Sequence, residues 1–150
     1  MASTDLPTRE VELSIDSRLE NVALLGAALS GIAAGLGFGE SERYHLELCL
    51  VEAASNSVRH AYGGEPGHPV RLRIMVDAER IEMRIADRGL PVPPEHRTSP
   101  ELVEVDPSDL SRLGEGGRGM FLMHTLMDEI TFGVEDGWNV LSLTKRRPPA

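Results

Sequence analysis

Two pairs of short segments with alternating apolar residues constrain this chain most, because each pair has the length and spacing of a β-hairpin. Residues 70–76 and 81–87 alternate on either side of a short polar turn. Residues 130–134 and 138–144 do the same around Asp136-Gly137, a dipeptide that favours tight hairpin turns. These segments predict a largely antiparallel sheet with one face that other elements must cover.

The segments between the hairpins predict helices. Residues 11–15 give one more strand, after which the apolar spacing changes to the three-and-four period of an amphipathic helix over residues 17 to 35–39. A second helix is predicted from Ser41, a candidate N-cap, to about Tyr62. A short third helix follows Gly119. This order predicts an α+β fold, a two-layer α/β sandwich whose mixed, mostly antiparallel sheet has its helices on one face.

The length and composition bound the class of protein. The 150 residues suit one domain, at residues 11–147, after a flexible tail at residues 1–10. With 24 acidic and 15 basic residues the net charge is −9, so we expect no direct nucleic-acid partner and an affinity for basic protein surfaces. Cys49 is the only cysteine, which excludes an internal disulfide. The absence of a run of about 20 apolar residues or of a targeting signal predicts a cytoplasmic protein that binds no membrane.

A polar stripe lies along the second predicted helix. Glu52 and Asn56 are four residues apart and share a face with Cys49 and His60. The carboxylate of Glu52 is suited to taking a proton from a nucleophile, and the amide oxygen of Asn56 is a suitable ligand for Mg²⁺. The alternative is an ordinary exposed glutamate, followed by an asparagine that helps to end the helix. His60 is more simply a structural hydrogen-bonding residue, and the five histidines lack the spacing of a zinc site.

Asp87 ends the inward-facing row of the strand at residues 81–87. A carboxylate in that position carries a desolvation penalty unless a ligand or a buried water satisfies it, and an adenine amino group is a natural donor. The alternative is a solvent-exposed aspartate that forms a turn with Gly89. The alternation of the strand favours the inward position.

A glycine-rich run, Gly116-Gly117-Arg118-Gly119, precedes the third predicted helix. The first N–H groups and the positive dipole end of a helix favour phosphate, glycines permit close approach, and Arg118 adds a charge. Glycine-rich turns are also common without a ligand, and this run lacks the Lys-Ser/Thr ending of a P-loop. Residues 91–113 are rich in proline and have no steady period, as in a long connection that forms either a functional lid or a disordered segment.

The order of these motifs, Glu-x-x-x-Asn, Asp-x-Gly, a lid and Gly-x-Gly, resembles the GHKL ATPase superfamily of gyrase, chaperone and histidine-kinase ATP domains. That superfamily has the Bergerat, histidine-kinase-like ATPase fold, and the resemblance covers residues 11–147. Residues 51–62 and 116–123, followed by residues 126–130, look like the anti-sigma factor serine/threonine-protein kinases of the RsbW and SpoIIAB type.

The resemblance implies a role for the residues of the second helix and of the second strand in the first hairpin. Glu52 corresponds to the general base, and Asn56 corresponds to the Mg²⁺ ligand within the ATP site. Asp87 corresponds to the acid that reads adenine, with Gly89 beside it.

The resemblance also extends to the glycine-rich run. Gly117 and Gly119 correspond to glycines that contact the triphosphate, and a phosphate contact by Arg118 is our own inference. The ATP lid would span about residues 91–116. Pro91 and Phe121 stand where many relatives have glycine, and we expect them to leave ATP binding intact while lowering the kinase rate.

The function implied by the resemblance is that of an ATP- and Mg²⁺-dependent protein serine/threonine kinase that acts as an anti-sigma factor. Such a protein regulates transcription in a stress response by partner switching. It holds a sigma factor inactive and phosphorylates a STAS-domain antagonist, which then no longer displaces the sigma factor. A homodimer is expected by resemblance alone. The alternative is a non-catalytic ATP-binding module that sequesters a partner without phosphorylating it.

Overall fold

The computed structural model describes residues 8–97 and 115–147, so most of the predicted lid and of the predicted tail lies outside the described residues. The elements follow one another in the predicted order, with two short helical turns added. They are β1 (Arg9–Asp16), α1 (Leu19–Gly35), α2 (Glu40–Asn56), the π-helix η1 (Ser57–Ala61), β2 (Pro69–Val76), β3 (Arg80–Asp87), the 3-10 helix η2 (Pro94–His96), α3 (Glu115–Leu126), β4 (Glu129–Glu135) and β5 (Trp138–Arg146).

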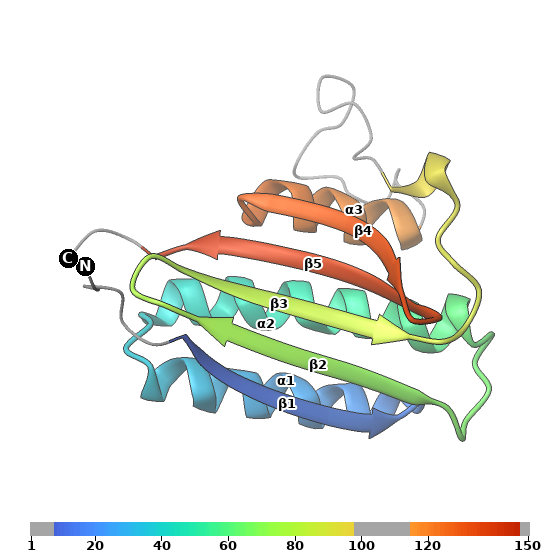
Figure 1. Ribbon diagram of the computed structural model, residues 1–150, viewed down its shortest axis with the longest axis horizontal. Helices are drawn as coiled ribbons and strands as arrows, with labels where there is room; N and C mark the ends of the chain where they lie inside the picture. The colour runs from blue at the N-terminus through green and yellow to red at the C-terminus, as the bar shows by residue number, and fades with distance from the viewer. Residues whose placement is uncertain (1–7, 98–114, 148–150) are drawn as a thin grey trace.

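The five strands form one sheet in the order β1-β2-β3-β5-β4, and every neighbouring pair of the described strands is antiparallel. The three α-helices lie on one face of this sheet, and the other face is left uncovered by them (Figure 1). The predicted two-layer α+β architecture is therefore confirmed. In the described part of the chain, no helix has the length and apolar character needed to cross a membrane.

The alternation along the strands directs apolar side chains against the helices. Leu72 and Ile74 of β2 are buried, and so are the β3 residues opposite them in the register. Leu29 of α1 and Leu46 and Leu50 of α2 complete the same core cluster. Burial of each such side chain contributes about 1.5–3 kcal/mol to folding, so this cluster holds the two layers together.

The predicted start of the second helix differs from the structure, whereas its predicted end near Tyr62 agrees with the end of the helical segment at Ala61. Gly39, and not Ser41, is the N-cap of α2, and it makes no side-chain cap hydrogen bond. Phe38, only 6% exposed, anchors the chain just before this helix, so a tertiary contact sets the start rather than a capping side chain. At the other end, the last turn widens into the π-helix Ser57–Ala61, which the apolar spacing did not predict.

The starts of two other elements also differ from the prediction. β1 begins at Arg9 rather than at residue 11, because Arg9 pairs with Val76 at the end of β2. That pairing depends on the neighbouring strand, so the alternation of apolar and polar residues in β1 does not predict it. α3 begins at Glu115, so the glycine-rich run forms the first turns of this helix rather than a loop before it.

Arg147 joins three distant parts of the fold. Its guanidinium donates hydrogen bonds to the carbonyl oxygens of Leu36 (2.6 Å), at the end of α1, and of Asp77 (3.2 Å), in the turn between β2 and β3. The same group lies 4.6 Å from the centre of the Phe38 ring. Arg147, the residue after β5, therefore has a structural role.

We expect the substitution Arg147→Ala to lower the free energy of unfolding by about 2 kcal/mol, because hydrogen bonds that involve a charged group are worth roughly 1.5–3 kcal/mol. Urea denaturation measures this loss. The neighbouring Arg146→Ala is a matched control on an exposed side chain, with an expected change below about 0.5 kcal/mol. Equal losses in the two variants would contradict the role of Arg147.

Candidate functional site

The end of α2 is tied to the loop after β3 through the π-helix η1. In this wide turn the N–H of Tyr62 donates to the carbonyl oxygen of Ser57 at 3.0 Å, five residues back. The carbonyl oxygen of Ala61 accepts a hydrogen bond from the N–H of Leu90 at 2.9 Å. π-Helical turns recur at functional sites, and this one connects a helix end to the Asp-x-Gly motif.

Gly89 packs directly against this helical turn. A Cβ atom at Gly89 would lie 2.2 Å from the carbonyl oxygen of Ala61, so no side chain fits between the loop and η1. On the other side of the loop, the N–H of Arg88 donates to the hydroxyl of Tyr62 at 2.7 Å, and that hydroxyl donates to the carbonyl oxygen of Pro69 at 2.6 Å. Burial raises the pKa of Tyr62, which keeps its hydroxyl proton available for this bond.

Asp87 is buried, with 8% of its surface exposed, as the alternation of its strand predicted. Its Oδ2 accepts a hydrogen bond from the hydroxyl of Ser57 at 2.8 Å. Its Oδ1 accepts two, from the N–H of Gly89 at 3.0 Å and from Nδ2 of Asn139 at 2.9 Å. The same Nδ2 also donates to the carbonyl oxygen of Gly89 at 2.8 Å. The expectation that only a ligand or a water would satisfy this carboxylate is therefore wrong.

Ser57 and Asn139 are the two residues of this network that sequence analysis missed. Ser57 fell on the apolar stripe of its helix, and Asn139 fell within a strand without a motif around it. Asn139 lies directly opposite Asp87 in the register of β3 and β5. The sequence does not show that these two strands pair, so it did not place Asn139 next to Asp87.

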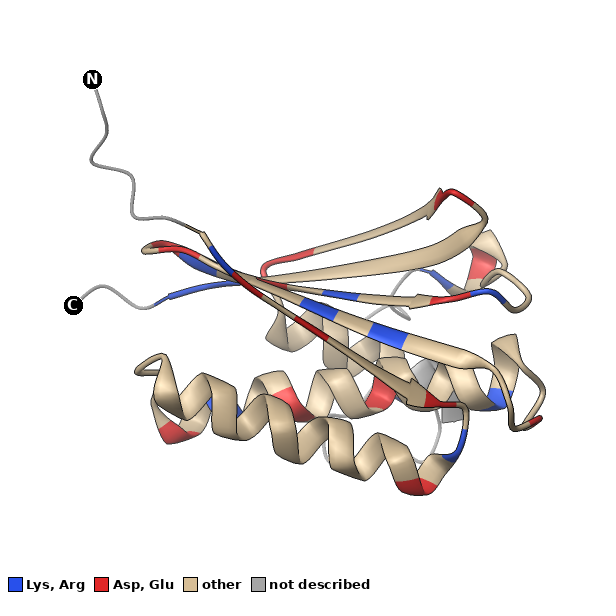
Figure 2. Cartoon of the chain, turned by 60° about the horizontal axis from the view of Figure 1, so that its bottom comes forward, with Lys and Arg blue, Asp and Glu red and all other residues tan. Residues whose placement is uncertain are grey.

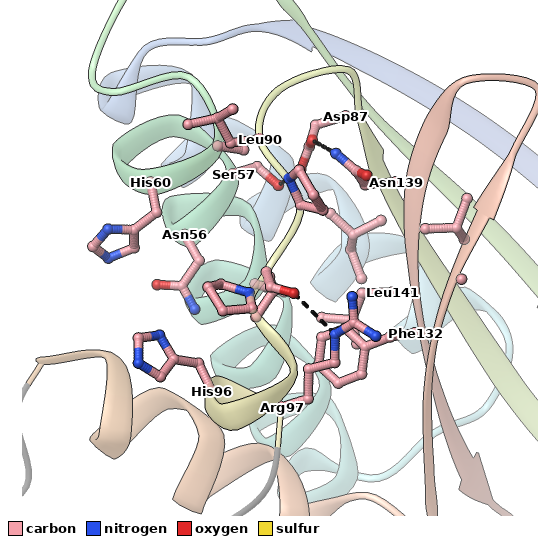
Figure 3. Close-up of a pocket in the computed structure, with 18 of the residues that line it drawn as sticks. Asn56, Ser57, His60, Asp87, Leu90, His96, Arg97, Phe132, Asn139 and Leu141 are labelled. Atoms are coloured by element: carbon pink, nitrogen blue, oxygen red, sulfur yellow. Dashed lines mark hydrogen bonds between the residues drawn. The ribbon is translucent and has the colours of Figure 1, made fainter.

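A pocket of about 710 Å³ opens beside Asp87, a volume typical of small-molecule sites. Asn56 and His60 border it from the helix side, and Phe132 and Leu141 border it from β4 and β5 (Figure 3). A third wall comes from residues 90–97, which we call the strap. The lining is mostly apolar by area, with polar groups from each of the three walls, as is usual for a small-molecule site.

Arg97 and His124, which belong to none of the sequence motifs, hold the strap in place. Nε of Arg97 donates to the carbonyl oxygen of Val92 at 3.0 Å, and its guanidinium lies 5.3 Å from the centre of the Phe132 ring. The carbonyl oxygen of Arg97 lies 3.1 Å from Nε2 of His124 in α3. These contacts hold the beginning of the predicted lid against β4 and α3.

Glu52 and Asn56 meet the glycine-rich helix at Gly119. A Cβ atom at Gly119 would lie 2.9 Å from Oε2 of Glu52 and 3.6 Å from Nδ2 of Asn56. The missing side chain therefore lets α3 pack on the polar face of α2. Glu52 and Gly119 lie beside the pocket rather than in its wall, and Asn56 connects the two regions.

The other candidates of the glycine-rich run lie in the first turns of α3. Gly117 is part of this helix, two residues before Gly119, and Arg118 is exposed. Within residues 8–97 and 115–147, no group of three or more His, Cys, Asp or Glu side chains is placed to hold a metal ion. A metal held at Asn56 would need most of its oxygen ligands from water and a bound phosphate, which is how Mg²⁺ is commonly bound.

Cys49, on the predicted polar stripe, has no place in the site. It is fully buried, and burial raises the pKa of its thiol to about 12. A neutral buried thiol is a packing residue and not a nucleophile.

We expect the substitution Gly89→Ala to lower the free energy of unfolding by about 2 kcal/mol, because the added methyl group must displace the backbone of η1. Thermal and chemical unfolding measure the loss. Gly31→Ala, on the open side of α1 with nothing within 4 Å of the new methyl group, is the matched control and should be neutral or stabilising. A Gly89→Ala variant as stable as the control would show that the loop does not need this close contact.

Comparison with known proteins places the chain in a family. The family model described as the histidine kinase-like ATPase domain matches residues 15–145. The serine-protein kinase RsbW of Bacillus pumilus is 32% identical over 137 residues, which cover 90% of this chain and 84% of the relative. RsbW of Bacillus subtilis is 32% identical over 136 residues, with the same coverage. RsbW of Listeria monocytogenes is 31% identical over 136 residues, which cover 88% of this chain and 84% of the relative.

A solved structure supports the same fold. The crystal structure of the RsbU and RsbW domains of a Mycobacterium tuberculosis protein superposes with a TM-score of 0.64 at 16% identity. The match covers 96% of this chain but only 34% of that longer chain, so it bears on the fold alone. Together, the family model and the three relatives show that the chain belongs to the histidine kinase-like ATPase domain family and, within it, groups with the serine-protein kinases RsbW.

Proposed function

We propose that this chain is a Mg·ATP-dependent protein serine/threonine kinase that also acts as an anti-sigma factor. The observation that carries the proposal is the convergence of Glu52, Asn56 and Gly119 beside a pocket whose other end holds Asp87. One end of this region has an acid, an amide and the glycine-rich first turns of α3, and the other end has a buried acceptor. These groups match the two ends of a purine triphosphate. The kinase relatives support this assignment.

Asp87 is proposed to read the adenine base, with Gly89 beside it. Oδ1 already accepts two hydrogen bonds and Oδ2 accepts one, so Oδ2 retains room for one further donor. The amino group of adenine supplies such a donor. Guanine would place a carbonyl oxygen there and leave two acceptors facing each other, which is costly in a buried site.

The phosphates are proposed to lie at the start of α3, where free N–H groups and the helix dipole favour negative charge. Gly117 and Gly119 would permit close approach there, and the exposed Arg118 would add a cation. Mg²⁺ held by Asn56 would neutralise charge on the phosphates during transfer.

Glu52 is the proposed general base of the reaction. It would accept the proton of a serine or threonine hydroxyl while that oxygen forms a bond to the γ-phosphorus of ATP. The bond between this phosphorus and the bridging oxygen breaks at the same time, and ADP leaves with the electron pair. Most of the rate would come from positioning and from charge stabilisation.

The proposed partners are a sigma factor, which the chain would sequester, and a STAS-domain antagonist, which it would phosphorylate. The net charge of −9 favours basic segments of a sigma factor. A protein that controls a sigma factor works in the cytoplasm, where transcription takes place. A homodimer is part of the proposal by analogy with the relatives.

Incubation with labelled ATP, Mg²⁺ and a purified STAS-domain antagonist tests the kinase assignment. We expect Glu52→Ala to lower the rate of phosphate transfer about 100-fold or more, since a general base contributes 10²–10⁴-fold. The affinity for ATP should stay close to that of the parent chain. Glu47→Ala, on the same helix, is the matched control and should transfer phosphate at the parent rate.

The outcomes separate the proposal from its alternative. Transfer by Glu52→Ala at the parent rate would reject Glu52 as the base. Partner binding without any label on the antagonist in the parent chain would instead identify a non-catalytic ATP-binding module.

A further inference from the structure

The face of the sheet opposite the helices carries a cluster that the nucleotide site does not use. Trp138, the only tryptophan of the chain, begins β5 on this face, because the next residue, Asn139, reaches inward to Asp87. The guanidinium carbon of Arg71 lies 4.1 Å from the centre of a Trp138 ring, and that of Arg88 lies 4.8 Å from it. We call Arg71, Arg88 and Trp138 the Arg-Trp cluster.

The strand register explains how these residues meet. Arg71 alternates with the buried Leu72 and therefore points away from the helices. It pairs with Ala86 of β3, which pairs in turn with Val140 of β5. The small side chain of Ala86 leaves room for the indole of Trp138 to reach across β3 toward Arg71. Basic residues lie along β2 and β3, with the helical layer on the other side of the sheet (Figure 2).

The two arginines of the cluster differ from the arginines next to them in forming no ion pair with the carboxylates of the described residues. Arg73 forms an ion pair with Glu10, and Arg84 forms ion pairs with two glutamates. Within the part of the chain that the structure describes, no carboxylate forms an ion pair with Arg71 or Arg88, and both residues are exposed. The net charge of the chain is −9, so two cations that stack on one ring and form no ion pair among the described residues make this patch locally basic.

We propose that the Arg-Trp cluster is a docking site for an acidic segment of a partner protein. Stacking on an indole limits the motion of a guanidinium and leaves its N–H groups free to bind a carboxylate through two parallel hydrogen bonds. Tryptophan and arginine are also the residues that most often dominate binding energy in protein interfaces. The acidic remainder of the surface repels an acidic segment elsewhere and so directs it to this cluster.

A protein segment fits the cluster better than a nucleic acid does. The cluster offers two guanidinium groups in a chain whose net charge is −9. The acidic surface around it repels a continuous row of phosphates, whereas two or three neighbouring carboxylates match the two guanidinium groups. The site also lies on the face away from the pocket, so docking there does not depend on the proposed kinase activity.

The single tryptophan makes the proposal directly testable, because its fluorescence reports on the cluster alone. The full chain is titrated with a short synthetic peptide rich in Asp and Glu, and with a matched peptide that has Asn and Gln instead. We expect a saturable change in Trp138 emission with the acidic peptide only, and weaker binding as salt is added. The double variant Arg71→Gln/Arg88→Gln should bind the acidic peptide about tenfold more weakly or worse.

The control variant removes the same charge from the same face. Arg80 and Arg146 face each other in the register at the other end of β3 and β5, so Arg80→Gln/Arg146→Gln should bind the acidic peptide like the parent chain. Arg71→Lys and Arg88→Lys keep the charge but lose the planar stacking, and each should weaken binding partially.

Three results would overturn the proposal. They are no saturable change in the parent chain, equal affinity in the double variant and the parent, or tighter binding of a single-stranded oligonucleotide than of the acidic peptide. Mg·ATP affinity, measured on the same variants, confirms that they are folded. Unchanged Mg·ATP affinity with lost peptide binding supports the docking site and leaves the proposed function untouched.

Discussion

The carboxylate of Asp87 is the group on which the rest of the site depends. Its three hydrogen bonds join η1 through Ser57, the loop after β3 through Gly89, and β5 through Asn139. A buried carboxylate without these donors would destabilise the fold, because desolvation of a charge is costly unless hydrogen bonds replace the lost water. The same bonds that stabilise the protein therefore set the shape and polarity of the pocket. Gly89 allows this junction to close, since even one methyl group would meet the backbone of Ala61.

The helix α2 unites the two ends of the site. Its last α-helical turns carry Glu52 and Asn56, which face α3 at Gly119, and the π-helical turn that follows places Ser57 on Asp87. The proposed general base Glu52, the proposed metal ligand Asn56 and Asp87, the proposed reader of adenine, are thus positioned by contacts of one continuous helical segment. A shift of this segment would move both ends of the site together.

The sequence predicted the fold class, the element order and the inward position of Asp87, because all of these follow from local periodicity. It did not predict the network around Asp87, since Ser57 has the spacing of a core residue and Asn139 meets Asp87 only through strand pairing. Two predicted helix starts, the N-cap at Ser41 and the start of the third helix after Gly119, were wrong because tertiary contacts set them. The first depends on the burial of Phe38, and the second depends on the packing of Gly119 on Glu52. The roles of Glu52, Asn56 and Gly117 rest on residue chemistry and a family resemblance, the phosphate contact of Arg118 is our own inference, and all of them stay predictions.

We propose that this junction forms one nucleotide site whose buried carboxylate reads the adenine base. Calorimetry of the unmodified chain with Mg·ATP and with Mg·GTP is the decisive measurement. We expect one ATP to bind per chain, and the affinity for GTP to be weaker by about tenfold or more, since a single misplaced hydrogen bond costs about 1.4 kcal/mol or more. No heat of binding with ATP, or equal affinity for the two nucleotides, would contradict it.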